Sequence, residues 1–207
     1  MKTLTQISRA ALTAVVLAAA GNAMAANAPA TVAVDAAYLS TNNLTVAGVG
    51  GSAYTTSGST GSVSLAIDTI PSMIIDFVDA AGFSITASSF LGDAVATFSN
   101  FKFDASTGVM SGNLVGGGLL GKLNYLNGDL LKANTLTGVG TNLITASNFT
   151  LADGLSAYLT TNKISPSLLP VSSVVKTVTL PVPEPTTYAL MGLGLVGISL
   201  VARKRQA

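Results

Sequence analysis

The chain has 207 residues, a formal net charge of +1, 49% hydrophobic residues and only 9% charged residues, with no Cys, His or Trp. The missing Cys excludes disulfides and thiolate chemistry, and the missing His removes the usual general base and transition-metal ligand. Between residues 26 and 182, five lysines and eight aspartates leave a charge of −3. Because this region has no basic cluster, the composition argues against nucleic-acid binding.

The first 25 residues have the organisation of a secretory signal peptide. Lys2 and Arg9 form a basic start, and residues 10–20 form an apolar segment without a charge. Ala23 and Ala25 fit the small-x-small rule, so we expect cleavage after Ala25. The alternative is a membrane anchor, but the apolar segment is too short to cross about 30 Å of hydrocarbon. The segment predicts export through the Sec translocon and removal by signal peptidase.

Residues 26–181 are expected to form one β-rich extracytoplasmic domain, because short β-prone runs broken by Gly, Asn and Asp dominate there. The expected fold is a single β-sandwich or a β-solenoid-like domain, and the sequence leaves both open because no repeat has a constant period. The signal helix and a C-terminal transmembrane helix would flank this domain. Strands are predicted at residues 31–34, 62–67, 73–78, 83–88, 95–103, 108–115, 119–126, 130–137, 143–151 and 174–180, and a short helix at 152–162.

Turn residues predict three reversals within this domain. Residues 104–108 form a five-residue loop that closes on Gly108, and Gly116–Gly118 offers a second reversal. Asn127-Gly128 is the strongest two-residue hairpin signal in the chain. Residues 48–61 are low in large apolar side chains and predict a flexible loop. The glycines before Lys122 resemble a phosphate-binding loop, but Leu123 stands where that motif needs Ser or Thr, so turn glycines are the better interpretation.

Phenylalanines are the expected aromatic anchors of the core. They are Phe77, Phe83, Phe90, Phe98, Phe101, Phe103 and Phe149.

The domain offers little catalytic chemistry. Asp is its only acidic residue type; Asp76 and Asp79 lie three residues apart, and Asp104 and Asp129 flank predicted turns. A paired-carboxylate hydrolase needs two acids that face one cleft, and the sequence shows no such convergence. We therefore expect no enzymatic activity, no cofactor and no metal site.

The C-terminus carries the most informative pattern. Residues 186–202 contain no charge and would form a helix about 25 Å long, which is within the range that spans a membrane. Arg203, Lys204 and Arg205 follow at once as a stop-transfer cluster, because each cation costs about 2.5–3.5 kcal/mol at the bilayer centre. Residues 182–185 precede the helix, and their two prolines favour an extended, accessible segment.

This order of features resembles the PEP-CTERM sorting domain. The resemblance covers residues 182–207 and rests on the Pro183-Glu184-Pro185 motif, the glycine-rich apolar segment and the terminal Arg203–Arg205 cluster. It implies that an exosortase recognises Pro183, Glu184 and Pro185, and that the apolar helix is then removed. It also implies a Gram-negative host that makes exopolysaccharide, with the precursor in the inner membrane and the mature form on the cell surface or outside the cell.

We therefore expect an exported, exosortase-processed structural protein of the surface or extracellular matrix, without enzymatic activity and associated with biofilm. Its expected partners are exosortase, the Sec translocon, signal peptidase, the membrane as a transient anchor, and exopolysaccharide. The alternative is a carbohydrate-binding or carbohydrate-cleaving module with the same anchor. Asn43 and Asn148 begin Asn-x-Thr triplets, so glycosylation is a further hypothesis.

Overall fold

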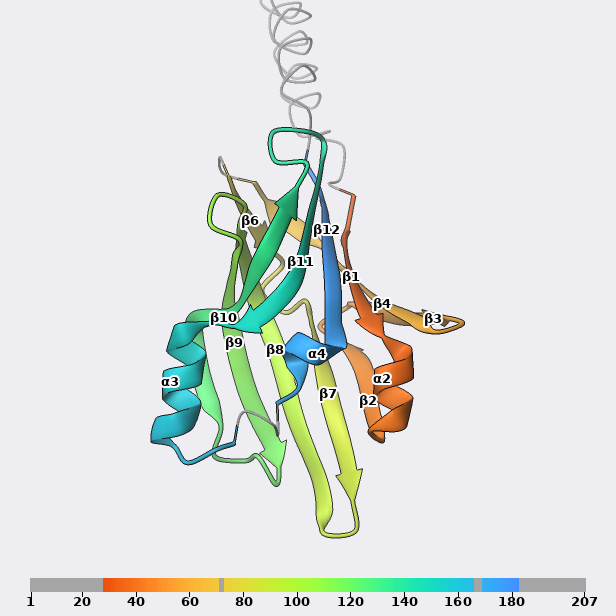
Figure 1. Cartoon of the computed structure of the whole chain (residues 1–207), viewed down its shortest axis with the longest axis vertical. Coiled ribbons are helices and arrows are strands. Elements are labelled where there is room, and N and C mark those ends of the chain that lie inside the picture. The colour runs from red at the N-terminus through yellow and green to blue at the C-terminus, as the bar shows by residue number, and fades with distance from the viewer. Residues whose placement is uncertain (1–27, 71–72, 166–168, 183–207) are drawn as a thin grey trace, which may run out of the picture.

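A computed structural model describes residues 28–70, 73–165 and 169–182. Strands make up 61% of these residues, which confirms the prediction of a mainly β protein. All twelve described strands belong to one antiparallel sheet, in place of the expected sandwich or solenoid. The sheet is curled into a nearly closed barrel (Figure 1).

The described elements are strands of very different lengths and three short helices. In chain order they are β1 (Ala30–Asp35), α2 (Ala36–Thr41), β2 (Leu44–Val49), β3 (Ala53–Ser57), β4 (Thr60–Leu65), β5 (Ile67–Thr69), β6 (Ile74–Phe77), β7 (Gly82–Ser89), β8 (Gly92–Asp104), β9 (Val109–Gly118), β10 (Asn124–Thr137), β11 (Leu143–Leu151), α3 (Asp153–Thr161), α4 (Val171–Val174) and β12 (Val175–Pro181).

The strand order explains how the sheet almost closes. The path runs β2-β7-β8-β9-β10-β11-β12-β1-β4-β3, with β5 and β6 as a short branch on β8. The two end strands of this path, β2 and β3, are consecutive in the chain and are joined by residues 50–52. Gly50 has φ +61°, and a Cβ there would lie 1.6 Å from the carbonyl oxygen of Ala80, so only glycine fits this turn. The short link therefore brings the two edges of the sheet together.

Asparagines mark the places where the central strands bend. The register shifts between Ser99 and Lys102 on β8 and again between Tyr125 and Gly128 on β10. Asn100 and Asn127 occupy these two irregularities with φ of 51° each, and the Asn100 side chain donates to the Asn127 side chain at 3.0 Å. Asparagine tolerates this left-handed conformation better than most residues, and bulges bend a strand and increase its twist. The paired bulges thus help the sheet to curl.

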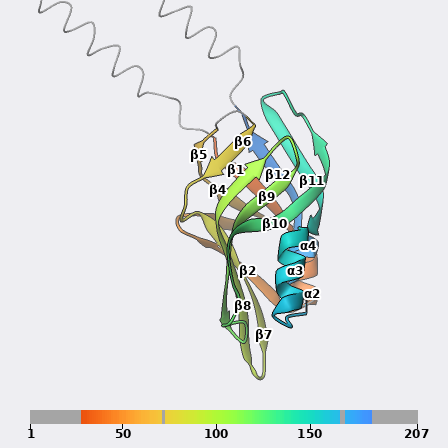
Figure 2. The ribbon, with the colours of Figure 1, turned by 90° about the vertical axis from the view of Figure 1, so that its left-hand side faces the viewer.

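Three helices cover one side of the curled sheet (Figure 2). α3 packs on β10, α2 packs on β2, and α4 contacts β11, β12 and α2. Leu155 and Leu159 of α3 are fully buried, as are Val171 and Val174 of α4. The helix predicted at 152–162 is confirmed as α3, whereas α2 and α4 were not predicted because each has fewer than two full turns.

A cluster of phenylalanines fills the core. Phe83 stacks on Phe98 at 5.1 Å between ring centroids and on Phe101 at 5.7 Å, and Phe77 meets Phe101 edge-on at 6.2 Å. Six of the seven expected anchors are buried. Phe90 is the exception: it lies 96% exposed in the turn between β7 and β8, so its prediction as a core residue was wrong. An apolar side chain such as Phe is expected in the core, but the β7–β8 hairpin extends beyond the barrel and leaves Phe90 in solvent.

Three further predictions fail at turns. Asn127-Gly128 lies inside β10 as a bulge and forms no hairpin, because only Asn127 of the pair has positive φ and the strand continues to Thr137. The strand expected at 119–126 begins only at Asn124, since residues 119–123 form the reversal after β9. The expected loop at 48–61 contains β3, whose mostly exposed side chains leave no hydrophobic alternation to detect.

Substituting Phe101 with Ala should lower the free energy of unfolding by about 3–5 kcal/mol, because the ring is 1% exposed and contacts two other rings. Urea denaturation of the body measures this change. Phe90→Ala is the matched control and should change stability by less than about 0.5 kcal/mol. Equal effects of the two substitutions would contradict this description of the core.

Asp35 should make stability depend on pH. Its Oδ1 accepts a hydrogen bond from the Tyr38 N–H at 2.8 Å, and its Oδ2 lies 3.2 Å from Lys176 Nζ. The bond from Tyr38, followed by that with Lys176, lowers the pKa of Asp35 below its usual 3.8. A carboxyl with a lowered folded-state pKa stabilises the fold above its unfolded pKa, and this stabilisation is lost as pH falls through the folded value.

Asp35→Ala should therefore unfold at lower urea concentration than the wild type at neutral pH, and the difference should shrink below roughly pH 4. Lys176→Met removes the ion pair but keeps the hydrogen bond between Asp35 and the Tyr38 N–H, so it should lower the free energy of unfolding less than Asp35→Ala does. A difference that stays constant from pH 7 to pH 3 would show that ionised Asp35 contributes nothing.

Candidate functional site

The junction between the barrel and the C-terminal tail is the candidate functional site, and β12 forms its foundation. β12 lies in the interior of the sheet, paired antiparallel with β1 on one side and β11 on the other. Val178 and Leu180 are fully buried, and Val175 is 2% exposed. Val178 and Leu180 alternate with Thr177 and Thr179 in the period-two pattern of a strand with one buried face, and Val175 stands three residues before Val178, where the pairing with β1 shifts in register. The strand before the tail is therefore held on both edges.

The last described residues remain attached to the barrel. Pro181 pairs with Leu143 at the start of β11, and proline is tolerated here because it ends the strand. The next residue, Val182, donates its N–H to the carbonyl of Asn142 at 2.9 Å. No free linker therefore separates the folded body from residue 183, where the expected sorting motif begins.

Both described ends of the chain lie at the same end of the barrel (Figure 1). Thr31 of β1 pairs with Thr179 of β12, and Ala30 is completely buried against β4. The β10–β11 loop, residues 138–142, lies at this end as well, whereas the β7–β8 hairpin points away from it (Figure 1). The barrel thus has a terminal end and a distal end.

The aspartates considered as catalytic candidates interact with other side chains or backbone groups, and they do not face one another across a cleft. Asp76 lies 3.2 Å from Lys102 Nζ. Asp104 caps the β8–β9 turn through hydrogen bonds to Ser106 and Thr107, and the Ser106 hydroxyl is the largest cause that lowers the Asp104 pKa. Asp129 lies beside Tyr125, whose pKa is raised chiefly by burial and next by this carboxylate. Within the described ranges, no three Asp or Glu side chains gather as a metal ligand set.

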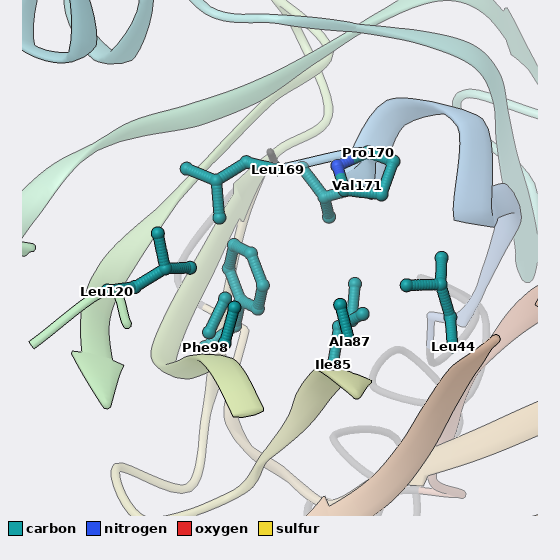
Figure 3. A pocket seen from close by; sticks show the side chains of 10 residues that line it. Leu44, Ile85, Ala87, Phe98, Leu120, Leu169, Pro170 and Val171 are labelled. Carbon is teal, nitrogen blue, oxygen red and sulfur yellow. The ribbon is translucent and has the colours of Figure 1, made fainter. Parts of the chain in front are cut away.

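Two hollows in the described structure differ in character. One lies between α4 and strands β2, β7 and β8, lined by apolar side chains such as Phe98, Leu120 and Leu169 (Figure 3). Its volume of about 10 Å³ leaves room for no more than one water molecule. The other has about 450 Å³ and lies between residues 118–122 and 162–164, beside Lys122 and Lys163. Leu120 and Gly121 form turn hydrogen bonds to Gly117 and Gly118, which agrees with turn glycines at the phosphate-loop-like segment.

The asparagines of the two glycosylation triplets lie at exposed irregular positions. Asn43 has φ 52° in the turn after α2. Asn148 has φ 56° and donates its side-chain amide to the Thr135 hydroxyl at 2.9 Å. A glycan on Asn148 would be attached to the same amide nitrogen and would leave it one N–H.

The residues predicted for sorting and export lie outside the described ranges. They are Ala23, Ala25, Pro183, Glu184, Pro185, Arg203, Lys204 and Arg205. The expected transmembrane helix at 186–202 lies outside them as well. Among the residues that are described, no helix has the length and apolarity to cross a bilayer.

A single curled β-sheet with a tail leaving beside its first strand defines a β-barrel-like body joined directly to a C-terminal signal. The family model of the PEP-CTERM protein-sorting motif matches residues 181–206, which include Pro183-Glu184-Pro185 and the terminal basic cluster. The chain is a PEP-CTERM sorting domain-containing protein. This motif implies a protein that is targeted to exosortase, anchored in a membrane as a precursor and then exported to the surface. No curated protein and no solved structure matches the chain.

The position of β12 predicts two different outcomes of C-terminal truncation. A chain of residues 26–182 keeps every described strand and should unfold cooperatively in urea, with a native far-ultraviolet circular dichroism spectrum. A chain of residues 26–174 loses β12, leaves one edge of β1 and one edge of β11 unpaired, and should not fold. Cooperative unfolding of both chains at the same urea concentration would contradict the central role of β12.

Proposed function

We propose that this protein is a non-enzymatic structural component of the cell surface or extracellular matrix, including the biofilm and its exopolysaccharide, and that exosortase processing delivers it there. The sorting motif at residues 181–206 supports the route. The structural engagement of Asp76 and Asp104 in an ion pair and a turn supports a body without catalytic carboxylates.

The observation that carries the proposal is the boundary between fold and tail. The motif match starts at residue 181, and β12 ends at Pro181. A cut within the motif therefore removes the tail and leaves all twelve described strands in the body. In this proposal the tail directs the protein to the cell surface, and the barrel performs the structural role there.

The alternative of a carbohydrate-binding or carbohydrate-cleaving module has less support. It would need a groove lined by aromatic side chains and paired aspartates. The 450 Å³ hollow is lined by glycine, leucine, isoleucine, asparagine and lysine, and the apolar hollow is too small for a sugar ring. We therefore favour a structural role.

Intact-mass spectrometry of the protein from its native host tests the route. The mature mass should lack both the first 25 residues and the apolar tail, while a strain without exosortase should retain the tail. Glu184→Ala in the wild-type strain should also retain the tail, because Glu184 is the only glutamate of the chain and stands at the centre of the motif. Asp153→Ala, in an exposed position at the start of α3, is the control and should be processed normally.

Identical masses with and without exosortase would reject the route. Separation of cells from extracellular matrix then locates the mature form. Recovery of the mature protein in the cytosolic fraction would reject the proposed site of action.

A further inference from the structure

The β10–β11 loop lies directly beside the residue at which the body ends. The Asn142 carbonyl accepts the hydrogen bond from Val182, and Leu143 pairs with Pro181. The loop projects at the same end of the barrel as the end of β12 (Figure 1). Whatever surface holds the tail is therefore close to this loop.

The length of chain beyond the body limits that distance. The uncharged segment of the tail begins at Thr186, four residues after Val182. Even fully extended, four residues cover at most about 14 Å. The polar interfacial layer on each side of a bilayer is itself about 5–8 Å thick. A body attached to a membrane through this tail must therefore lie against, or immediately above, the headgroups.

The loop has the composition of a segment that can enter such a layer. Residues 138–142 of the loop and the adjoining Leu143 of β11 carry no charge, so their insertion avoids the cost of desolvating ions. Val139 and Leu143 are 46% and 49% exposed, which leaves apolar surface free for contact with lipid.

The conformation of the loop is also fixed within the body. The Thr141 hydroxyl shares its one hydrogen between the carbonyl oxygens of Gly138 at 2.7 Å and Leu143 at 3.1 Å, and the Thr141 N–H donates to the Gly138 carbonyl at 2.9 Å. These hydrogen bonds satisfy backbone carbonyl and N–H groups that would otherwise have to be hydrogen-bonded to water. The exposed apolar side chains are thus presented on a defined turn.

We propose that the β10–β11 loop is a membrane-contact site that rests on the lipid surface holding the tail, with Val139 and Leu143 in its interfacial layer. This inference rests on the membrane-anchored precursor, and it adds that the body docks on the bilayer in a defined orientation. The terminal end of the barrel faces the lipid, and the β7–β8 hairpin points away. Docking would hold the Pro183-Glu184-Pro185 motif at a constant depth for a membrane-embedded protease.

The missing tryptophan makes this orientation measurable, because each introduced Trp is the only one in the chain. Val139→Trp and Leu143→Trp place the reporter in the proposed contact. Phe90→Trp is the matched control at the distal end, at a side chain that is already 96% exposed. β8 alone, with 13 residues, spans roughly 40 Å between the two ends.

The full-length chain carrying each substitution is reconstituted in phosphatidylcholine vesicles with or without brominated acyl chains, which quench Trp at contact. Trp at positions 139 and 143 should lose most of its fluorescence in brominated vesicles, and Trp at position 90 should keep it. Two reporters in the loop protect the result against one substitution that fails to fold, and circular dichroism checks each variant.

The possible failures are distinguishable. If the chain floats with the vesicles but positions 139 and 143 remain unquenched, the docking inference is overturned while tail anchoring stands. If position 90 is quenched as strongly as the loop positions, the orientation is wrong. If the full-length chain does not float with vesicles, the proposed anchoring itself fails, and the docking inference fails with it.

Discussion

The pairing of β12 with β1 and β11 is the interaction on which the rest of this structure depends. It joins the last described strand to the first, in the middle of the strand order and far from either edge. Without it, the β1–β4–β3 group would be separated from the sheet that runs from β2 to β11. The buried faces of Val32, Ala146 and Val178 meet across these ladders with at most 1% exposure. Because β1 and β12 lie near opposite ends of the described chain, the barrel can close only when almost the whole body is available to fold.

Most strands could be predicted from the sequence because their signal is local. In β4, β7, β11 and β12, buried apolar residues alternate mainly with Ser and Thr, and in β1 they alternate with Thr31 and Ala33, so one face of each strand is buried. The curl of the sheet could not be predicted, since it depends on bulges whose positions follow from neighbouring strands. Asn127-Gly128 is an example. The dipeptide by itself favours a hairpin, but Asn127 accepts a hydrogen bond from Asn100 on β8, and the pair lies at a bulge inside the longer strand β10. Phe90 fails for the related reason that residue type does not say whether a hairpin extends beyond the core.

The sorting tail could be predicted from the sequence for a different reason. Its recognition depends on the length of the apolar segment, the absence of charge, two prolines and a final basic cluster, and all four are visible in the sequence itself. The body supplies what the sequence could not: the tail starts without a linker, beside the N-terminal strand and an uncharged loop. Sorting and folding thus meet at one short boundary, because the motif match begins at Pro181, the last residue of β12.

The interior position of β12 also has a mechanical consequence. A pull on residue 182 along the strand, for example from flowing water on a protein held at the cell surface, loads both flanking ladders in shear. Their hydrogen bonds run perpendicular to the strand, so several must break together before the strand slides. An edge strand such as β3 would instead peel away one bond at a time under a pull across the sheet. The barrel therefore resists force best at the point where it is tethered.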